Sequence, residues 1–257
     1  MGKPVILITN DDGLNAPGLR KLINIMLPLG RIYVVGSERP MSGTGHAITV
    51  REPLRLTPVA KDENYEEYFC SGTPVDCVKL GSQVVIGRKP DLLVSGINHG
   101  SNASVNVVYS GTMAAVIEGC IDGIPSIGYS LLDYSHKADF SACDPYVRKI
   151  AQAVLEKGLP KGTCLNVNIP AVNGSEIKGM KVCRQANARW EEEFDIRKDP
   201  ANKEYYWLTG IFKHLDDGKD TDQWALENNY VSVVPVHYDL TAHHALKEID
   251  NWKLNGN

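Results

Sequence analysis

The sequence predicts an α/β fold built on a parallel β-sheet, with a C-terminal extension of β-ribbon and helix. Short apolar runs rich in β-branched residues recur along the chain, as strands buried on both faces require. Segments with apolar residues at helical spacing follow several of these runs. The 257 residues can bury a large core. We expect a single domain over 1–257, with its core at about 1–177 and 221–236 and projecting oligomerisation elements at about 178–220 and 237–257.

The first strand and helix enclose an acidic turn. The run VILI at 5–8 predicts the strand, Pro17 opens the helix and Gly30 closes it. Between them, the adjacent carboxylates of Asp11 and Asp12 follow the end of the strand. Ligands of parallel sheets bind beyond the carboxyl ends of the strands, and two like charges there are most easily kept ionised by a bound cation. An ordinary Asp-Asp-Gly turn is the alternative.

The next elements are assigned from composition and from helix-capping residues. We expect a strand at 31–36, a polar loop at 37–46, an extended excursion at 47–56 and a solvated connection at 61–67. Thr73 then caps a helix that Pro74 opens and Gly81 ends, and Asp76 belongs to this cap rather than to chemistry.

A third unit places polar residues at the start of a helix. A buried strand at 91–95 runs into a polar stretch, and Ser110, Gly111 and Thr112 stand immediately before the helix that begins at Met113. Unpaired amide groups, hydroxyl donors and a favourable helix dipole make such a position a phosphate site. The competing interpretation is a plain helix cap.

The rest of the chain continues this alternation and then changes character. We expect a strand at 124–129, a helix capped by Asp144 and ended by Gly158, a strand at 164–170, a β-ribbon at 178–207, a short helix or turn at 221–228, a strand at 230–235 and a helix at 240–252. The ribbon carries aromatic residues that suggest a subunit contact, with local packing as the alternative: Trp190, Tyr205, Tyr206 and Trp207.

Bulk properties exclude several classes of protein. A net charge of -4 gives no electrostatic case for binding a nucleic-acid polymer or a membrane surface. The N-terminus has neither a cationic region nor a long apolar one, so we expect no signal peptide, and no apolar run approaches the length of a bilayer span. The six cysteines are scattered without a CxxC pair, so we expect buried, reduced thiols and a cytoplasmic protein.

Five motifs follow one another along the chain: ITNDDG at 8–13 with APG at 16–18, MSGTGHAIT at 41–49, SGTPVDCVKLG at 71–81, PDLLVSGINHGSN at 90–102 and YSGTMAAVIEG at 109–119. A later stretch is TDQWALENNYVSVVP at 221–235. These motifs and the later stretch resemble the SurE (survival protein E) family of metal-dependent 5'/3'-nucleotidases. The similarity therefore extends over nearly the whole chain.

The resemblance implies a Rossmann-like core and one divalent cation per subunit, held by Asp11, Asp12, Ser42 and Asn98. It also implies a C-terminal arm exchanged between subunits in a homodimer or homotetramer. All four implied ligands offer hard oxygen atoms, which suit magnesium or manganese better than zinc or copper. In a crystal, calcium could occupy the same site. Nucleoside monophosphates and phosphate are the implied small-molecule partners, with short-chain polyphosphate as a further substrate.

Roles in phosphate-ester hydrolysis can be assigned on this basis. A bound divalent cation would polarise the phosphoryl group and lower the pKa of water. Asp12 would also orient or deprotonate the attacking water. The non-bridging oxygens would be held by Asn98, Asn102, Ser110, Gly111 and Thr112. Two loop histidines, His46 and His99, are the candidates for protonating the leaving oxygen.

Three other functions are compatible with an acidic pair after the first strand. A phosphoaspartate phosphatase usually carries Asp-x-Asp, whereas Asn10 and Gly13 flank an adjacent pair here. A receiver-like domain needs a phosphoacceptor aspartate at the end of its third strand, where this chain has Ser95 and Asn98. A non-catalytic module that binds metal and nucleotide would keep the phosphate contacts without turnover.

Overall fold

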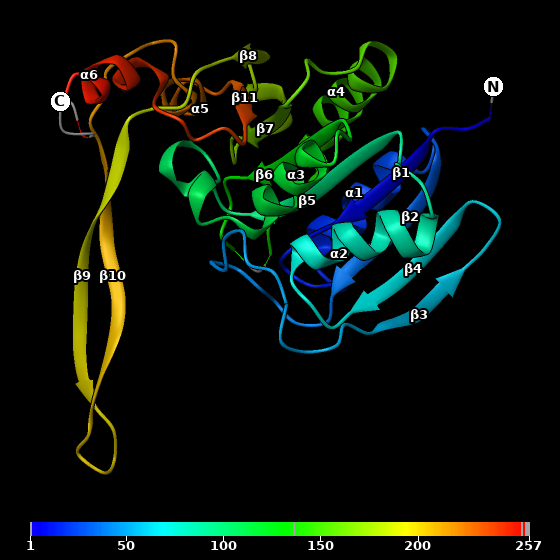
Figure 1. The fold of residues 1–257 in the computed structure, drawn as a ribbon, viewed down its shortest axis with the longest axis horizontal. Coiled ribbons are helices and arrows are strands. Elements are labelled where there is room, and N and C mark those ends of the chain that lie inside the picture. The colour runs from blue at the N-terminus through cyan, green and yellow to red at the C-terminus, as the bar shows by residue number, and fades with distance from the viewer. Residues whose placement is uncertain (1, 136, 253, 255–257) are drawn as a thin grey trace.

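A nine-stranded sheet forms the body of the molecule in a computed structural model that describes residues 2–135, 137–252 and 254 (Figure 1). The strand order is β3-β4-β2-β1-β5-β6-β7-β11-β8. The strands are β1 (Val5–Thr9), β2 (Arg31–Ser37), β3 (Leu56–Lys61), β4 (Tyr65–Cys70), β5 (Leu92–His99), β6 (Ser126–Leu131), β7 (Thr163–Ile169), β8 (Met180–Val182) and β11 (Val231–His237). Neighbours from β4 to β7 pair in parallel, so the predicted α/β fold with a parallel core is confirmed.

Helices cover both faces of this sheet, and alternate side chains of β1 pack against the helices on each face. Ile6 and Ile8 pack in the same apolar cluster as residues of α1 (Pro17–Met26) and α4 (Asp144–Lys157). Leu7 points to the other face, in a cluster with residues of α2 (Pro74–Leu80) and α3 (Gly111–Ile121). Since successive side chains of a strand alternate between faces, a strand buried on both sides needs the unbroken apolar run that the sequence shows.

A long hairpin projects from the body (Figure 1). Its strands are β9 (Ala188–Lys198) and β10 (Glu204–His214), which pair antiparallel in a separate two-stranded sheet. The ribbon predicted at 178–207 is therefore present, but it begins at Ala188 and ends at His214, whereas Met180–Val182 forms β8 of the main sheet. Near the base of the hairpin lie two short helices, α5 (Asp222–Glu227) and α6 (Leu246–Asp250).

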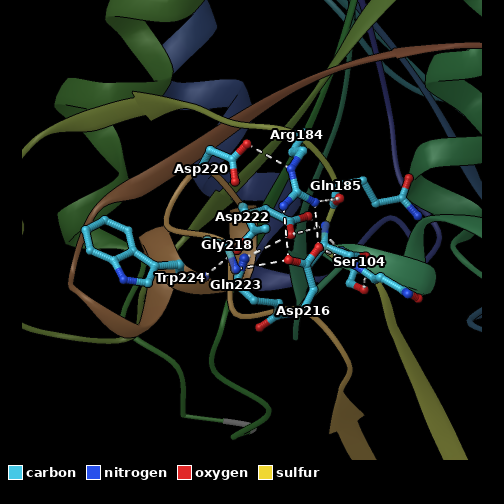
Figure 2. Close-up of polar contacts among 12 residues, drawn as sticks. Ser104, Arg184, Gln185, Asp216, Gly218, Asp220, Asp222, Gln223 and Trp224 are labelled. Carbon is cyan, nitrogen blue, oxygen red and sulfur yellow. Dashed lines mark hydrogen bonds and ion pairs between the residues drawn. The ribbon is translucent and has the colours of Figure 1, made fainter.

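Buried polar contacts fix the base of the hairpin to the body (Figure 2). The carboxylate of Asp222 accepts hydrogen bonds from the amides of Ser104, at 2.8 Å, and Ala186, at 2.9 Å. The hydroxyl of Ser104 donates to the carbonyl oxygen of Ala186 at 2.9 Å. Arg184 pairs with Asp216 as well, at a distance of 2.5 Å. Ser104 begins a short 3-10 segment, Ser104–Val108, which lies between β5 and α3 in the chain.

Several predicted boundaries are wrong, and the largest error concerns 61–67. Tyr65 begins strand β4, and Glu66 and Glu67 are buried rather than solvated. The carboxylate of Glu66 pairs with Arg31 at 2.9 Å, and Glu67 pairs with Arg20. A strand that buries paired charges lacks the apolar pattern by which strands are found in a sequence.

The predicted helix ends are also shifted. The first helix ends at Met26 rather than Gly30, and α2 continues past Gly81 into a π-helical segment, Gly81–Ile86. Asp144 is the first residue of α4, after Cys143 as N-cap, and its carboxylate pairs with Arg148. The expected helix at 240–252 is confined to α6 and the 3-10 turn His243–Ala245 before it.

Other expectations are confirmed. Thr73 and Asp76 form a reciprocal capping box at the start of α2. Ser110 caps α3, the short helix expected at 221–228 is present as α5, and the strand expected at 91–95 is present but runs on to His99. All six cysteines are buried free thiols. None of the helices in the described part of the chain has both the length and the apolar character needed to cross a bilayer.

Candidate active site

A cleft of about 250 Å³ lies beyond the carboxyl ends of β1 and β5, next to the start of α3. Residues from five sequence segments line it: Asp11, Ser42, Gly43, Asn98, His99, Ser101, Asn102, Asn106, Tyr109, Ser110, Tyr134 and Trp190. Of the residues singled out in the sequence, the cleft brings together Asp11, Ser42, Asn98, His99, Asn102 and Ser110. Asp12, His46, Gly111 and Thr112 do not line it.

Asp11 is buried at the end of β1 and is held by the start of α3. Its carboxylate accepts a hydrogen bond from the hydroxyl of Thr112. Burial raises the pKa of Asp11, and the hydroxyl of Thr112 together with the backbone amides of Thr112 and Gly111 lowers it in part. A methyl group on Gly111 would lie 2.9 Å from Asp11 Oδ2, so only glycine lets the helix approach the carboxylate this closely.

Asp12 lies beside the end of β5. Its Oδ2 atom accepts a hydrogen bond from the amide of His99 at 3.3 Å. Burial raises the pKa of Asp12 to about 6, and the charge of neighbouring Asp11 adds to this effect. The two carboxylates therefore destabilise each other's ionised forms, as the sequence led us to expect for this pair.

Asn98 reaches the cleft because β5 is irregular there. The pairing of β5 with β6 shifts between Ser95 and Asn98, and such a bulge re-aims the side chains that follow it. Gly96 makes the irregularity feasible: its φ is +118°, and a Cβ would meet the Tyr129 carbonyl oxygen at 2.3 Å. The Asn98 amide nitrogen donates to the carbonyl oxygens of His99 and Gly100, so its Oδ1 atom is left to accept another partner.

Ser42 is exposed on the polar loop that follows β2. Two backbone hydrogen bonds place this loop over the cleft. The amide of Met41 donates to the carbonyl oxygen of Asp11 at 2.7 Å, and the amide of Gly45 donates to that of Tyr109 at 3.2 Å. The hydroxyl of Ser42 therefore stands at the same edge of the sheet as the acidic pair.

The residues predicted to contact phosphate already make hydrogen bonds within the protein, and these bonds decide which of their polar atoms could still bind a ligand. Ser110 is buried, and its Oγ atom accepts from the amide of Met113 at 3.0 Å, which is a capping bond. The Thr112 hydroxyl is committed to Asp11. The side-chain amide of Asn102 donates a hydrogen bond to Ser130 Oγ at 2.9 Å. The helix-cap alternative therefore describes Ser110, and phosphate binding by this segment stays a prediction.

The two candidate proton donors lie in different surroundings. His99 lines the cleft, and the edge of Phe140 packs against its ring at 4.9 Å between centroids. The Nε2 atom of His46 lies 2.9 Å from a carboxylate oxygen of Glu118, which is buried in α3 and also pairs with Lys79. His46 therefore ties the loop of Ser42 to α3.

The donor set fits a hard divalent cation. Two adjacent carboxylates with raised pKa values and the oxygens of Asn98 and Ser42 are the ligand types that magnesium and manganese prefer. In the described residues, no group of three His, Cys, Asp or Glu side chains lies close enough together to hold a metal ion, so a cation at this site would also need the oxygens of Asn98 and Ser42.

Sequence reasoning missed Tyr109, Tyr134, Asn106 and Trp190 as cleft residues. Tyr109 and Asn106 stand close in sequence to Ser110, and their position just before the helix cap was the available indication. Trp190 comes from the hairpin, and only the fold brings it to the cleft.

Comparison with known proteins gives one consistent result. The family described as survival protein SurE matches residues 6–192. A protein of Christiangramia forsetii named 5'-nucleotidase SurE is 58% identical over 255 residues, which cover 98% of each chain. A protein of the same name from Flavobacterium psychrophilum is 56% identical over 99% of this chain and 100% of its own.

A solved structure agrees with the sequence matches. The crystal structure of the SurE protein from Aquifex aeolicus superposes with a TM-score of 0.83 at 40% identity, covering 97% of this chain and 99% of the other. Agreement over the full length confirms the Rossmann-like core that the motifs implied. The chain belongs to the SurE family.

Proposed function

We propose that this chain is a hydrolase that releases phosphate from nucleoside 5'-monophosphates. The observation that carries the proposal is the cleft at the ends of β1 and β5, which Asp11, Ser42 and Asn98 line together beside the N-terminus of α3. The relatives named 5'-nucleotidase SurE, matched over almost their whole length, support the same activity.

We further propose one divalent cation per subunit, magnesium or manganese, with Asp11, Asp12, Ser42 and Asn98 as the residues that would hold it. When bound, such a cation supplies Lewis-acid polarisation of the phosphoryl group and a water of lowered pKa. The mutual destabilisation of the two ionised carboxylates supports this assignment, because an added positive charge would relieve it.

The chain's own residues would bind the substrate and move protons. Asn98, Asn102 and Ser110 line the cleft and are placed to hold the phosphate oxygens. Asp12, with its raised pKa, is suited to accept a proton from the attacking water. His99 lines the cleft whereas His46 is held by Glu118, so we propose His99 as the donor to the leaving oxygen.

The exposed position of Ser42 at the cleft supports a wider substrate range. We propose that nucleoside 3'-monophosphates and short-chain polyphosphate are also hydrolysed, because the phosphate contacts do not depend on which ester oxygen leaves. We propose the cytoplasm as the compartment, because all six cysteines are free thiols.

We also propose that the hairpin contributes to a homodimer or homotetramer. Its exposed apolar side chains include Phe194 and Ile196 on β9 and Tyr206 on β10. A contiguous apolar surface of this kind marks an interaction site on a soluble protein. Light scattering on the purified chain would measure the assembly, and a monomer at every concentration would contradict this part of the proposal.

The test of the activity is phosphate release from nucleoside 5'- and 3'-monophosphates and from tripolyphosphate. Each substrate is incubated with magnesium, with manganese or with excess chelator. We expect release from the 5'-monophosphates to require the cation and to return when it is added back. Nucleotide binding without release under any cation would contradict the proposal and would favour a non-catalytic nucleotide-binding module.

A further inference from the structure

A second, larger cavity adjoins the candidate active site. Its volume is about 450 Å³, and its walls are formed by Tyr109, Trp190, Glu192, Leu208, Thr209 and Gly210. Tyr109 and Trp190 also line the smaller cleft that holds Asp11 and Ser110. The two spaces therefore share a wall of two aromatic rings, and a molecule anchored in one reaches directly into the other.

The aromatic wall is held in place by contacts on both sides. The indole nitrogen of Trp190 donates to Asn106 Oδ1 at 2.9 Å, which joins the hairpin to the 3-10 segment beside the cleft. Phe212, directly opposite Trp190 in the hairpin register, packs edge-on against the indole at 5.3 Å between centroids. The buried bonds of Asp222 to Ser104 and Ala186 fix the same two segments at their base (Figure 2).

Both rings remain accessible despite these contacts. Tyr109 is 51% exposed and Trp190 is 41% exposed. Glu192 places a carboxylate in the larger cavity, and this charge disfavours a second anionic group there. The occupant that suits this cavity is an uncharged, flat group attached to an anion in the neighbouring cleft.

From this arrangement we propose that Tyr109 and Trp190 form the nucleobase subsite of the enzyme, an inference that rests on the proposed function. With the phosphate beside Ser110 in the smaller cleft, the base of a nucleoside monophosphate extends into the larger cavity and stacks on the indole and phenol rings. The cavity volume is within the range of small-molecule sites.

Stacking sets the kind of selectivity that this subsite provides. Aromatic side chains contact the face of a base and not its hydrogen-bonding edge, so every base has a surface that they can bind. The subsite therefore distinguishes nucleotides from phosphate esters without a base, and it accepts purines and pyrimidines alike. Residues of two segments far apart in sequence, at 109 and 190, make this distinction together.

The experiment compares AMP with ribose 5-phosphate, which carries the same phosphate ester but no base. We expect Trp190→Ala to lower kcat/KM for AMP by about 5- to 150-fold, the range that one stacked base is worth. For ribose 5-phosphate we expect a change of less than about twofold, because no stacking is lost. Trp190→Phe keeps an aromatic face without the indole nitrogen and should retain most of the activity on AMP.

Trp207→Ala is the matched control. Trp207 is on the same hairpin, but it neighbours Leu208 in β10 and so points to the face opposite the cavity. We expect this variant to keep the wild-type ratio of kcat/KM for the two substrates. Adenosine, which lacks the phosphate, supplies a second measurement: calorimetry without added metal should show binding that Trp190→Ala weakens and Trp207→Ala does not.

Failure of the subsite and failure of the proposed function give different results. Equal loss on AMP and ribose 5-phosphate in Trp190→Ala, or no loss on either, would overturn the subsite and leave the phosphatase activity intact. Absence of release from both substrates by the wild-type protein would overturn the proposed function. Adenosine binding that Trp190→Ala leaves unchanged would also overturn the subsite, whatever the activity.

Discussion

The hydroxyl of Thr112 donates a hydrogen bond to Asp11 Oδ1 across 101 positions of sequence. Through this bond the first turn of α3 contacts the carboxylate at the end of β1. The backbone amides of Gly111 and Thr112 reinforce the contact. The positive end of the α3 dipole therefore acts on the protein's own carboxylate, and the acidic pair and the helix form one unit.

Thr112→Val tests the contact between α3 and the acidic pair, because valine has nearly the same shape as threonine. The hydroxyl that donates to Asp11 is lost, and a hydrogen bond to a charged group contributes about 1.5–3 kcal/mol. We expect the cation concentration needed for half-maximal phosphate release to rise by about 10- to 150-fold, because the carboxylate loses that support. Thr112→Ser retains the hydroxyl and should stay close to wild type. An unchanged cation requirement in Thr112→Val would show that the bond does not support Asp11.

Gly111→Ala tests the closeness of the same contact. The added methyl would lie 2.8 Å from Asp11 Cβ and 2.9 Å from its Oδ2, so the carboxylate must move. A displacement of about 1 Å near a reacting centre can lower the rate by about 100-fold, and we expect kcat/KM for AMP to fall by roughly this factor. Gly174→Ala, where the nearest atom outside its neighbours is 3.7 Å away, is the control. Wild-type activity in Gly111→Ala would contradict the packing described.

Glu118→Gln tests the ion pairs that tie the Ser42 loop and α2 to α3. Burial alone would raise the pKa of Glu118, but hydrogen bonds from Lys79 and His46 lower it below its usual value of 4.5. The ionised group is therefore more favourable in the folded protein than in the unfolded chain, and it stabilises the fold at neutral pH. Since both partners are partly exposed, we expect the variant to lose only about 1 kcal/mol of unfolding free energy at pH 7.

The pH dependence of this loss follows from the sign of the shift. The stabilisation is complete above pH 4.5 and disappears as the pH falls through the lower pKa of the folded state. Urea unfolding of wild type and Glu118→Gln at several pH values should show the two stabilities converging in acid. Glu156→Gln, at an exposed position of α4, should match wild type throughout. A difference that persists unchanged in acid would contradict the role of the ionised carboxylate.

Local pattern is sufficient for the sheet and for the acidic turn. The run at 5–8 has the composition of a strand buried on both faces, and ligands of parallel sheets bind beyond the strand ends, so the sequence alone places Asp11 and Asp12 at a binding edge. The family resemblance, not the local pattern, adds Asn98 to this pair. The segment at 110–112 does lie at the start of a helix, but the sequence does not show which of its residues caps the helix and which bonds to Asp11. Whether the Thr112 hydroxyl binds a ligand or Asp11 depends on a contact between distant segments, which no local pattern records.

Long-range packing explains the remaining errors. From the sequence, Glu66 and Glu67 are predicted to be solvated because their cationic partners, Arg31 and Arg20, come from other elements. The sequence assigns Trp190 to a projecting ribbon, whereas its hydrogen bond to Asn106 and the contacts at the base of the hairpin place it against the cleft. In both cases the sequence contains both partners, but it does not show that they contact each other.

The most direct test of the central claim is a calorimetric titration of the metal-free protein with manganese, repeated on Asp11→Asn and Asp12→Asn and followed by phosphate release from AMP. We predict one manganese ion per wild-type chain, with both the binding and the release lost in either variant. Undiminished manganese binding together with metal-dependent release in both variants would contradict the claim that this acidic pair holds the cation.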